Sequence, residues 1–147
     1  AHLLMKLRDT DDWLRLTELA LIEGPSEANW RRKAAFNLHQ AVETAYACFL
    51  LVHTFYFPRS HNIKFLRSLA EDVDTRLVEA WPREQRFDRR RFELLKRAYV
   101  EARYSDQYDA SPEDLDWLMS RARLLRDRVS ELCQTRISEL KTKAQIA

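Results

Sequence analysis

One short polar segment, residues 102–109, gathers side chains that can hold a phosphate or organise one another. It reads Ala-Arg-Tyr-Ser-Asp-Gln-Tyr-Asp and lies between two long stretches of helical periodicity. Connections of this kind are usually rich in glycine or proline. An arginine such as Arg103 binds phosphate through paired hydrogen bonds. The segment therefore either forms a phosphate site or fastens two helices together.

A second polar group, residues 39–43, interrupts the most apolar helical stretch of the chain. Helical spacing places Gln40 and Glu43 on a stripe beside the apolar seam, at the edge of the core. An unpaired carboxylate is costly there, so Glu43 needs a cation, and Arg103 is the partner we expect. The pair would be either a structural ion pair or a pair that orients a ligand site.

The histidines give weaker signals. His61 follows Ser60, the expected cap of a short helix, and either solvates the loop or binds an anion beside Lys64. His39 and Glu43 lie four residues apart on one helical face. A metal site needs three or four such ligands, and no further His or Cys has matching spacing, so we expect no metal.

An arginine-rich stretch runs from residue 83 to residue 103. Arginine suits bidentate contacts with phosphate, but rows of charge also occur on solvated helix faces. The stretch is therefore either a solvated face or a stripe that faces an anion. The net charge of +2 is too small to indicate a general attraction to nucleic acid.

The elements that position these residues are predicted to be helices. The chain has one glycine and four prolines, too few for the frequent turns of a sheet protein, and the lone Gly24 excludes a glycine-rich phosphate loop. Apolar residues recur at helical spacing over residues 9–22, 27–56, 84–102 and from Ser111 to about 137, with shorter helices after Ser60 and over 75–81. We predict an all-α, up-and-down bundle of four to six helices that forms a single domain over residues 1–147.

Cys48 and Cys133 lie within helical patterns, and we expect them to be small buried residues without a disulfide. The longest apolar run, residues 49–57, is too short to span a bilayer, and no signal peptide opens the sequence. We therefore expect a cytoplasmic protein with no membrane partner. The chain begins at Ala1, so either the initiator methionine has been removed or the chain is a C-terminal fragment of a longer protein.

In their order, three segments of the chain resemble the HEPN (higher eukaryotes and prokaryotes nucleotide-binding) domains. Residues 35–45, Ala-Phe-Asn-Leu-His-Gln-Ala-Val-Glu-Thr-Ala, resemble the long helix of that family. Residues 60–66, Ser-His-Asn-Ile-Lys-Phe-Leu, resemble its "THdl..L" helix start, and residues 102–108 resemble its "aRYpd" stretch. The resemblance covers roughly residues 9–137 and implies a helical bundle.

Many HEPN domains are metal-independent RNases that use an arginine and a histidine with four to six residues between them, at a dimer interface. Arg103 matches the arginine, but the chain has Tyr108, Asp109 and Ala110 where the histidine would stand, and no histidine follows Arg103. Without that general acid or base the usual cleavage mechanism is incomplete. A tyrosine, with a pKa of ~10, is a poor replacement.

The closest resemblance, over residues 38–41, 60–71 and 94–105, is to HEPN domains fused behind a nucleotidyltransferase domain. This implies a non-catalytic, homodimeric module that binds nucleotide or RNA phosphate and serves a nucleotidyltransferase in cis or in trans, with no cofactor. Arg103 would contact phosphate beside His61 and Lys64, and Tyr104 or Tyr108 would stack on a base. Site-orienting residues in this reading are Gln40, Glu43 and Asp106.

Two alternatives stay open. One is a toxin-like RNase with a rebuilt site that uses His39 or His61, and the other is a purely structural dimerisation domain. Three tryptophans that look exposed in the sequence, Trp30, Trp81 and Trp117, also favour a homodimer.

Overall fold

The computed structural model describes residues 4–146, so Ala1 and the question of the native start lie outside it. The described chain consists of helices and the loops that join them, with no strand, as the composition predicted. The helices are α1 (Met5–Glu23), α2 (Ala28–Thr54), α3 (Ile63–Val73), the 3-10 helix η2 (Thr75–Ala80), α4 (Arg86–Tyr104) and α5 (Pro112–Ile146).

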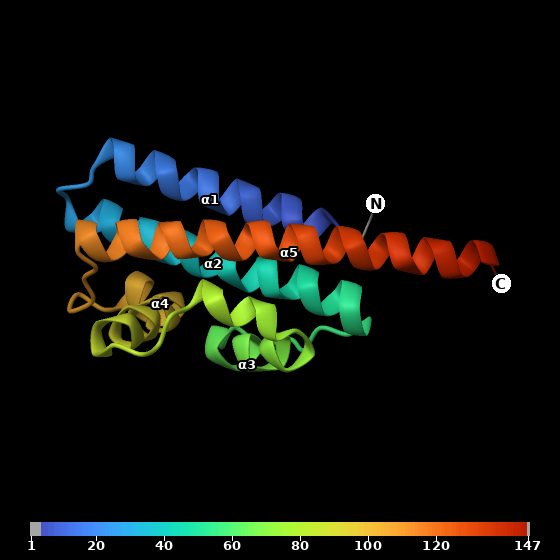
Figure 1. Cartoon of the computed structure of the whole chain (residues 1–147). Coiled ribbons are helices and arrows are strands. Elements are labelled where there is room, and N and C mark those ends of the chain that lie inside the picture. Colours follow the sequence, from blue (N-terminus) through green and yellow to red (C-terminus); the bar gives the residue numbers. More distant parts are fainter. Residues whose placement is uncertain (1–3, 147) are drawn as a thin grey trace.

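Helix α2 is the centre of the bundle. It packs against α1, α3, α4 and α5, and its side chains between Ala34 and Val52 are mostly buried. Helices α1, α2 and α5 share one axis direction, α1 running antiparallel to the other two, whereas α4 is seen close to end-on and so crosses beneath α2 (Figure 1). The last turns of α5 extend beyond the other helices (Figure 1). This arrangement brings one face of α2 against the C-terminal end of α4.

Local signals explain where the helices begin and end. At the first turn Gly24 lies against the Trp30 ring, which leaves no room for a Cβ atom. Phe55 ends α2 in the left-handed region, with φ 60°. Ser111 starts α5 through a capping box, since Asp114 N donates to Ser111 Oγ at 3.0 Å and Ser111 N donates back to the carboxylate.

The predicted N-cap of α3 was wrong, because it lay before the residue that caps the helix in the structure. Asn62, not Ser60, is the N-cap, because its side-chain oxygen accepts hydrogen bonds from Lys64 N and Phe65 N. Ser60 Oγ instead accepts a hydrogen bond from Asn62 N. His61 therefore lies in the loop that precedes α3, outside the helix.

The prediction that Trp81 is exposed was wrong. Its ring is fully buried against Phe92, at 4.9 Å between centroids, because the chain after η2 turns inward. Trp30 and Trp117 are half-buried, so the tryptophans no longer support a homodimer. Cys48 and Cys133 are buried and not joined by a disulfide, with 3.9 Å between the sulfur atoms. No helix within residues 4–146 is long and apolar enough to cross a membrane.

Candidate functional site

A groove of about 360 Å³ lies between α2 and the end of α4. Five of its lining residues come from one face of α2, because they recur at spacings of three and four residues. They are Asn29, Arg32, Lys33, Phe36 and Asn37, and the remaining wall is Ala102 and Arg103. Three cations, two amides and one aromatic ring therefore face a single surface hollow.

Arg103 is exposed, and its guanidinium group is held by aromatic rings rather than by a carboxylate. Its carbon Cζ lies 4.7 Å from the centroid of Phe36, 4.6 Å from that of Tyr99 and 5.0 Å from that of Tyr104. Arg103 Nε donates to the Tyr99 carbonyl at 2.8 Å. No carboxylate pairs with it among residues 4–146, so its terminal nitrogens stay available to an anion.

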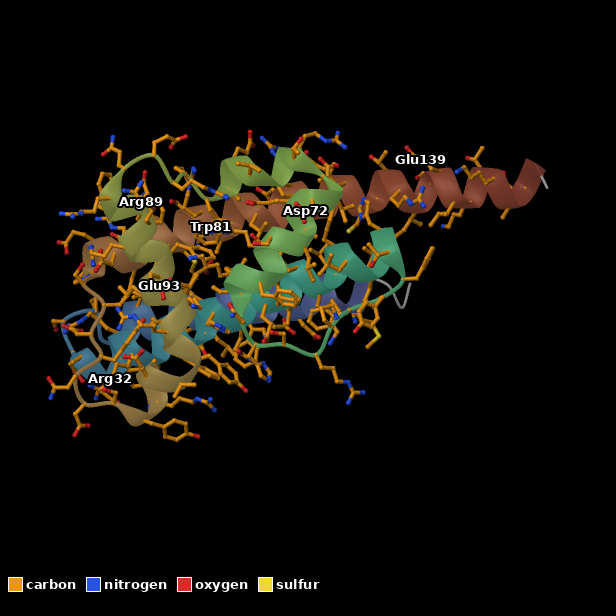
Figure 2. All side chains as sticks on the ribbon, turned by 90° about the horizontal axis from the view of Figure 1, so that it is seen from below. Arg32, Asp72, Trp81, Arg89, Glu93 and Glu139 are labelled. Carbon is orange, nitrogen blue, oxygen red and sulfur yellow. The ribbon has the colours of Figure 1, made fainter. Side chains whose placement is uncertain are left out.

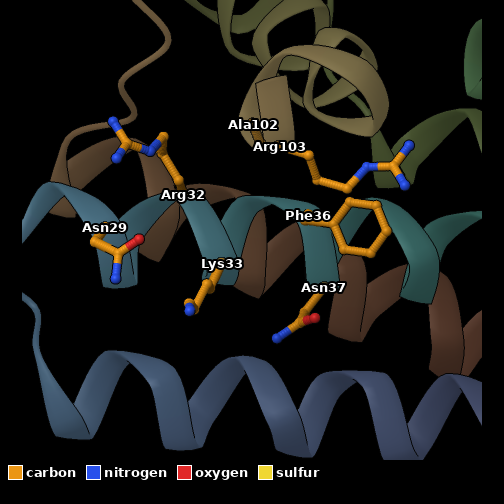
Figure 3. A pocket seen from close by; sticks show the side chains of 7 residues that line it. All are labelled: Asn29, Arg32, Lys33, Phe36, Asn37, Ala102 and Arg103. Carbon is orange, nitrogen blue, oxygen red and sulfur yellow. The ribbon is translucent and has the colours of Figure 1, made fainter. Parts of the chain in front are cut away.

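The cations of the groove stand in a row rather than around one point. Figure 3 shows the Arg32 and Arg103 guanidinium groups projecting away from each other at the two ends, while Lys33 and Asn37 point toward the α1 side. Lys33 Nζ lies 5.2 Å from the Trp30 ring centroid. A row of separated charges suits a ligand with several spaced phosphates better than a single ion.

The expected ion pair between Glu43 and Arg103 does not form. Glu43 pairs instead with His61, at 2.5 Å between Oε1 and Nδ1, because the loop before α3 lies over that part of α2. Only 11% of the Glu43 side chain is exposed, against 58% of His61. Burial raises the pKa of Glu43, and the hydrogen bond with His61 opposes that rise.

The Glu43–His61 pair lines a second hollow of about 290 Å³. Two cations, Lys6 and Arg59, line the same hollow, together with the hydroxyl-bearing Thr44 and Ser60. A carboxylate that fixes one nitrogen of an imidazole leaves the other nitrogen free to accept or donate a proton. Among the described histidines, His61 is the one that pairs with a carboxylate, whereas His39 meets Gln40 and His53 meets the Phe49 carbonyl.

Tyr99 joins the two hollows. Its ring stacks on that of His61, with centroids 4.1 Å apart and planes at 12°, and it also supports the Arg103 guanidinium. The buried His39 ring lies 5.3 Å from the same tyrosine. Burial is the main cause that lowers the pKa of His39 to about 4, so His39 is neutral at physiological pH and closed to substrate.

A family model for the HEPN domain matches residues 12–132 of the chain. The chain belongs to the HEPN domain family. This match confirms the all-α prediction and the resemblance, and it supports a function that involves nucleotides or RNA. No protein in the curated collection of characterised sequences matches the chain.

In this HEPN domain, the polar segment after α4 is held differently from the prediction. Tyr108 is buried, and its hydroxyl donates to the Leu94 carbonyl at 2.9 Å, so its ring is not presented to a base. Burial also raises its pKa. Asp106 is exposed and makes no hydrogen bond or ion pair within residues 4–146, whereas Asp109 pairs with Arg31 of α2 at 3.2 Å. The loop is therefore fixed by Tyr108 and Asp109.

The structure places the other predicted site residues at different points of the molecule. Tyr104 is 75% exposed beside Arg103, as a base-stacking residue must be. Gln40 Oε1 accepts a hydrogen bond from His39 Nδ1 at 3.3 Å, and so Gln40 positions a buried ring rather than Arg103. Lys64 lies on a third hollow, between α3 and α4, and does not line the hollow of His61. No three His, Cys, Asp or Glu side chains of the described chain come together as metal ligands would.

Sequence reasoning missed three residues of the candidate site: Arg32, Lys33 and Tyr99. The face shared by Asn29, Arg32, Lys33 and Phe36 could have been found from helical spacing alone. The role of Tyr99 could not, because its apolar neighbours made it look like an ordinary core residue of α4.

Proposed function

We propose that this HEPN domain is a non-catalytic module that binds the phosphates of a nucleotide or RNA in the groove between α2 and α4. One observation carries the proposal: Arg32, Lys33 and Arg103 line the groove, and none has a carboxylate partner among the described residues. Many other arginines of the surface are paired, for example Arg97 with Glu101 at 3.2 Å and Arg126 with Asp11 at 2.8 Å. The charge of a cation without a carboxylate partner is not neutralised within the protein, so it can attract the phosphates of a ligand.

The aromatic rings complete the argument. Phe36 forms part of the groove wall, and the exposed Tyr104 ring flanks Arg103. Stacking of a base on such a ring contributes ~1–3 kcal/mol without regard to sequence. A phosphate on Arg103 and a base on Tyr104 would therefore combine charge and stacking over a short distance. The groove volume also lies within the range of ~300–1,000 Å³ that is usual for small-ligand sites.

The proposal includes two partners that rest on the resemblance. The first is a second copy of the chain, which would bring two Arg103 side chains together. The second is a nucleotidyltransferase, fused to this domain or separate from it. Light scattering coupled to gel filtration tests the first, and co-purification with a candidate nucleotidyltransferase tests the second.

Binding of ATP, GTP and a short single-stranded RNA, measured by calorimetry and fluorescence anisotropy, tests the site itself. Arg103→Ala should weaken binding by roughly tenfold or more, since a hydrogen bond to a charged group contributes about 1.5–3 kcal/mol. Arg97→Ala is the matched control, because Arg97 lies on the same helix, is exposed and does not line the groove. Equal affinities for the two variants would refute the site.

The salt dependence gives an independent readout. Each phosphate contact on a single strand contributes about −0.7 to the slope of log K against log salt. An Arg32→Ala, Lys33→Ala double variant should therefore reduce the magnitude of that slope by about 1.4. An unchanged slope would show that these two side chains do not contact phosphate.

A second candidate function is RNA cleavage, and the Glu43–His61 pair favours it. His61 would accept the proton of the ribose 2′-hydroxyl, whose oxygen attacks the adjacent phosphorus to form a 2′,3′-cyclic phosphate and expels the 5′-oxygen, which takes a proton from water. His61 and Arg103 both contact the Tyr99 ring, although His61 does not follow Arg103 in the sequence. Incubation of end-labelled RNA with the wild type, His61→Gln and Glu43→Gln decides the matter. Absence of cleavage by the wild type, or equal cleavage by all three, would exclude this mechanism.

A further inference from the structure

A third hollow, of about 150 Å³, lies between α3 and α4 and is distinct from the two described above. Its walls carry four cations and one carboxylate: Lys64, Arg67, Arg83, Arg89 and Glu93, with Phe92 and Pro82 as apolar surface. Arg89 and Glu93 project from α4 on the side of the molecule where Trp81 is buried (Figure 2). None of these residues lines the groove of Arg103 or the hollow of His61.

Arg67 is the unusual member of this cluster. Its guanidinium carbon lies 4.0 Å from the centroid of Phe92, and its Nε is buried with no hydrogen-bond partner in the described chain. No carboxylate pairs with it within residues 4–146. Burial and the neighbouring charge of Arg83 lower its pKa. A half-buried cation in such surroundings is costly unless an anion compensates it.

The neighbouring carboxylates supply only part of that compensation: Glu71 and Glu93 favour the charged form of Arg67, but neither forms an ion pair with it. Glu71 is engaged by Arg83 through two hydrogen bonds, at 3.0 and 2.6 Å. Glu93 Oε1 lies 3.6 Å from Lys96. Arg89 donates to the carbonyls of Arg83 and Glu84 at 2.6 and 3.0 Å, which fixes the chain that closes one side of the hollow. The walls are therefore held in place, and neither Arg67 nor Lys64 has a carboxylate partner among the described residues.

We propose that this hollow binds one phosphoryl group, with Arg67 and Lys64 as its charged ligands. The volume supports a small oxyanion rather than a whole nucleotide, because small-molecule sites usually measure ~300–1,000 Å³. Arg67 presents its fork of donors from a fixed position on Phe92, and Lys64 is exposed at the rim and supplies a mobile charge. The site is independent of the proposed function, which uses other residues.

Titration with inorganic phosphate at constant ionic strength tests the proposal, with chloride as the reference anion. The side-chain N–H resonance of Arg67 is followed in ¹H–¹⁵N spectra, and the dissociation constant is measured by calorimetry. We expect saturable binding that moves this resonance. Arg67→Met should weaken it at least tenfold, because the variant keeps the apolar stem and removes the charge. Arg97→Met, a change of the same kind at an exposed position, should leave it unchanged.

Two further arms make the result specific. Lys64→Gln changes an exposed side chain without affecting the core, so a severalfold weaker affinity in this variant supports the site even where Arg67→Met fails to fold. If a nucleoside monophosphate competes with inorganic phosphate, the hollow accepts a phosphoryl group that is part of a larger molecule. If it does not compete, the site binds the free phosphate ion. The proposal is overturned by wild-type protein that binds no phosphate, or by Arg67→Met and Lys64→Gln variants that bind it with wild-type affinity.

Discussion

Acidification should destabilise the bundle through one residue, His39. The ring is fully buried and its pKa is lowered from 6.5 to about 4, chiefly by burial, although Gln40 and the main chain of His61 favour the protonated form. Between these two pH values the unfolded chain binds a proton that the folded chain does not. The free energy of unfolding therefore falls as the pH drops from about 6.5 toward 4. Above about 6.5 the contribution of the neutral, buried His39 is present in full. At about 1.4 kcal/mol per pH unit, the loss on reaching pH 4 is roughly 3 kcal/mol.

Urea denaturation at pH 7 and pH 4, for the wild type and for His39→Gln, measures this contribution. The other titrating groups are common to both proteins, so their effects cancel in the difference. His39→Gln should be less stable than the wild type at pH 7, but it should lose about 3 kcal/mol less on acidification. His53→Gln is the control, because the His53 ring is only half-buried whereas that of His39 is fully buried. The same pH dependence in the wild type and His39→Gln would refute the reasoning.

Three further variants probe the fold and the site by urea denaturation. Gly24→Ala should cost about 1–3 kcal/mol, since the new Cβ would lie 2.8 Å from Trp30 Cγ; a neutral effect would mean that the indole moves freely. Ser111→Ala should cost about 1 kcal/mol through loss of the α5 cap, and Ser111→Asp should recover most of it; equal stability of the two variants would contradict the capping box. Arg103→Ala should cost no more than about 1 kcal/mol, because the arginine is exposed, whereas a loss of ~3–5 kcal/mol would support the purely structural alternative.

Much of the fold could be predicted from the sequence, because helical periodicity and capping signals act locally. The Ser111-Pro112 start of α5 was found in this way, and so was the end of α1 at Gly24. Trp81 was misplaced because its burial depends on how the chain after η2 packs on α4, which no local signal reports. The α3 cap was assigned to Ser60 for a similar reason, since Ser60 and Asn62 are both good capping residues and only the backbone geometry chooses between them.

The site was harder to predict than the fold. Arg103 and Tyr104 were singled out because an arginine and a tyrosine are unusual in a helix-to-helix connection; the structure places both in the last turn of α4, and their role in binding stays a prediction. The prediction of Arg103 as the partner of Glu43 was wrong. The choice between Arg103 and His61 depends on the position of the loop that carries His61, and no local signal reports that position. Tyr108 was taken for a ligand residue because a buried tyrosine and an exposed one have the same appearance in a sequence.

The central place of α2 has a consequence for the way the domain opens. Every other α-helix packs on it, so α2 cannot lose its hydrogen bonds while the rest of the bundle stays folded. Amide protons in its buried middle, from Val42 to Phe49, should exchange with solvent only through complete unfolding. The exposed last turns of α5 contact little else and should exchange by local fraying. A single hydrogen-exchange experiment therefore reads the global stability from α2, and a ligand of the groove should slow exchange there by the same factor by which it stabilises the whole domain.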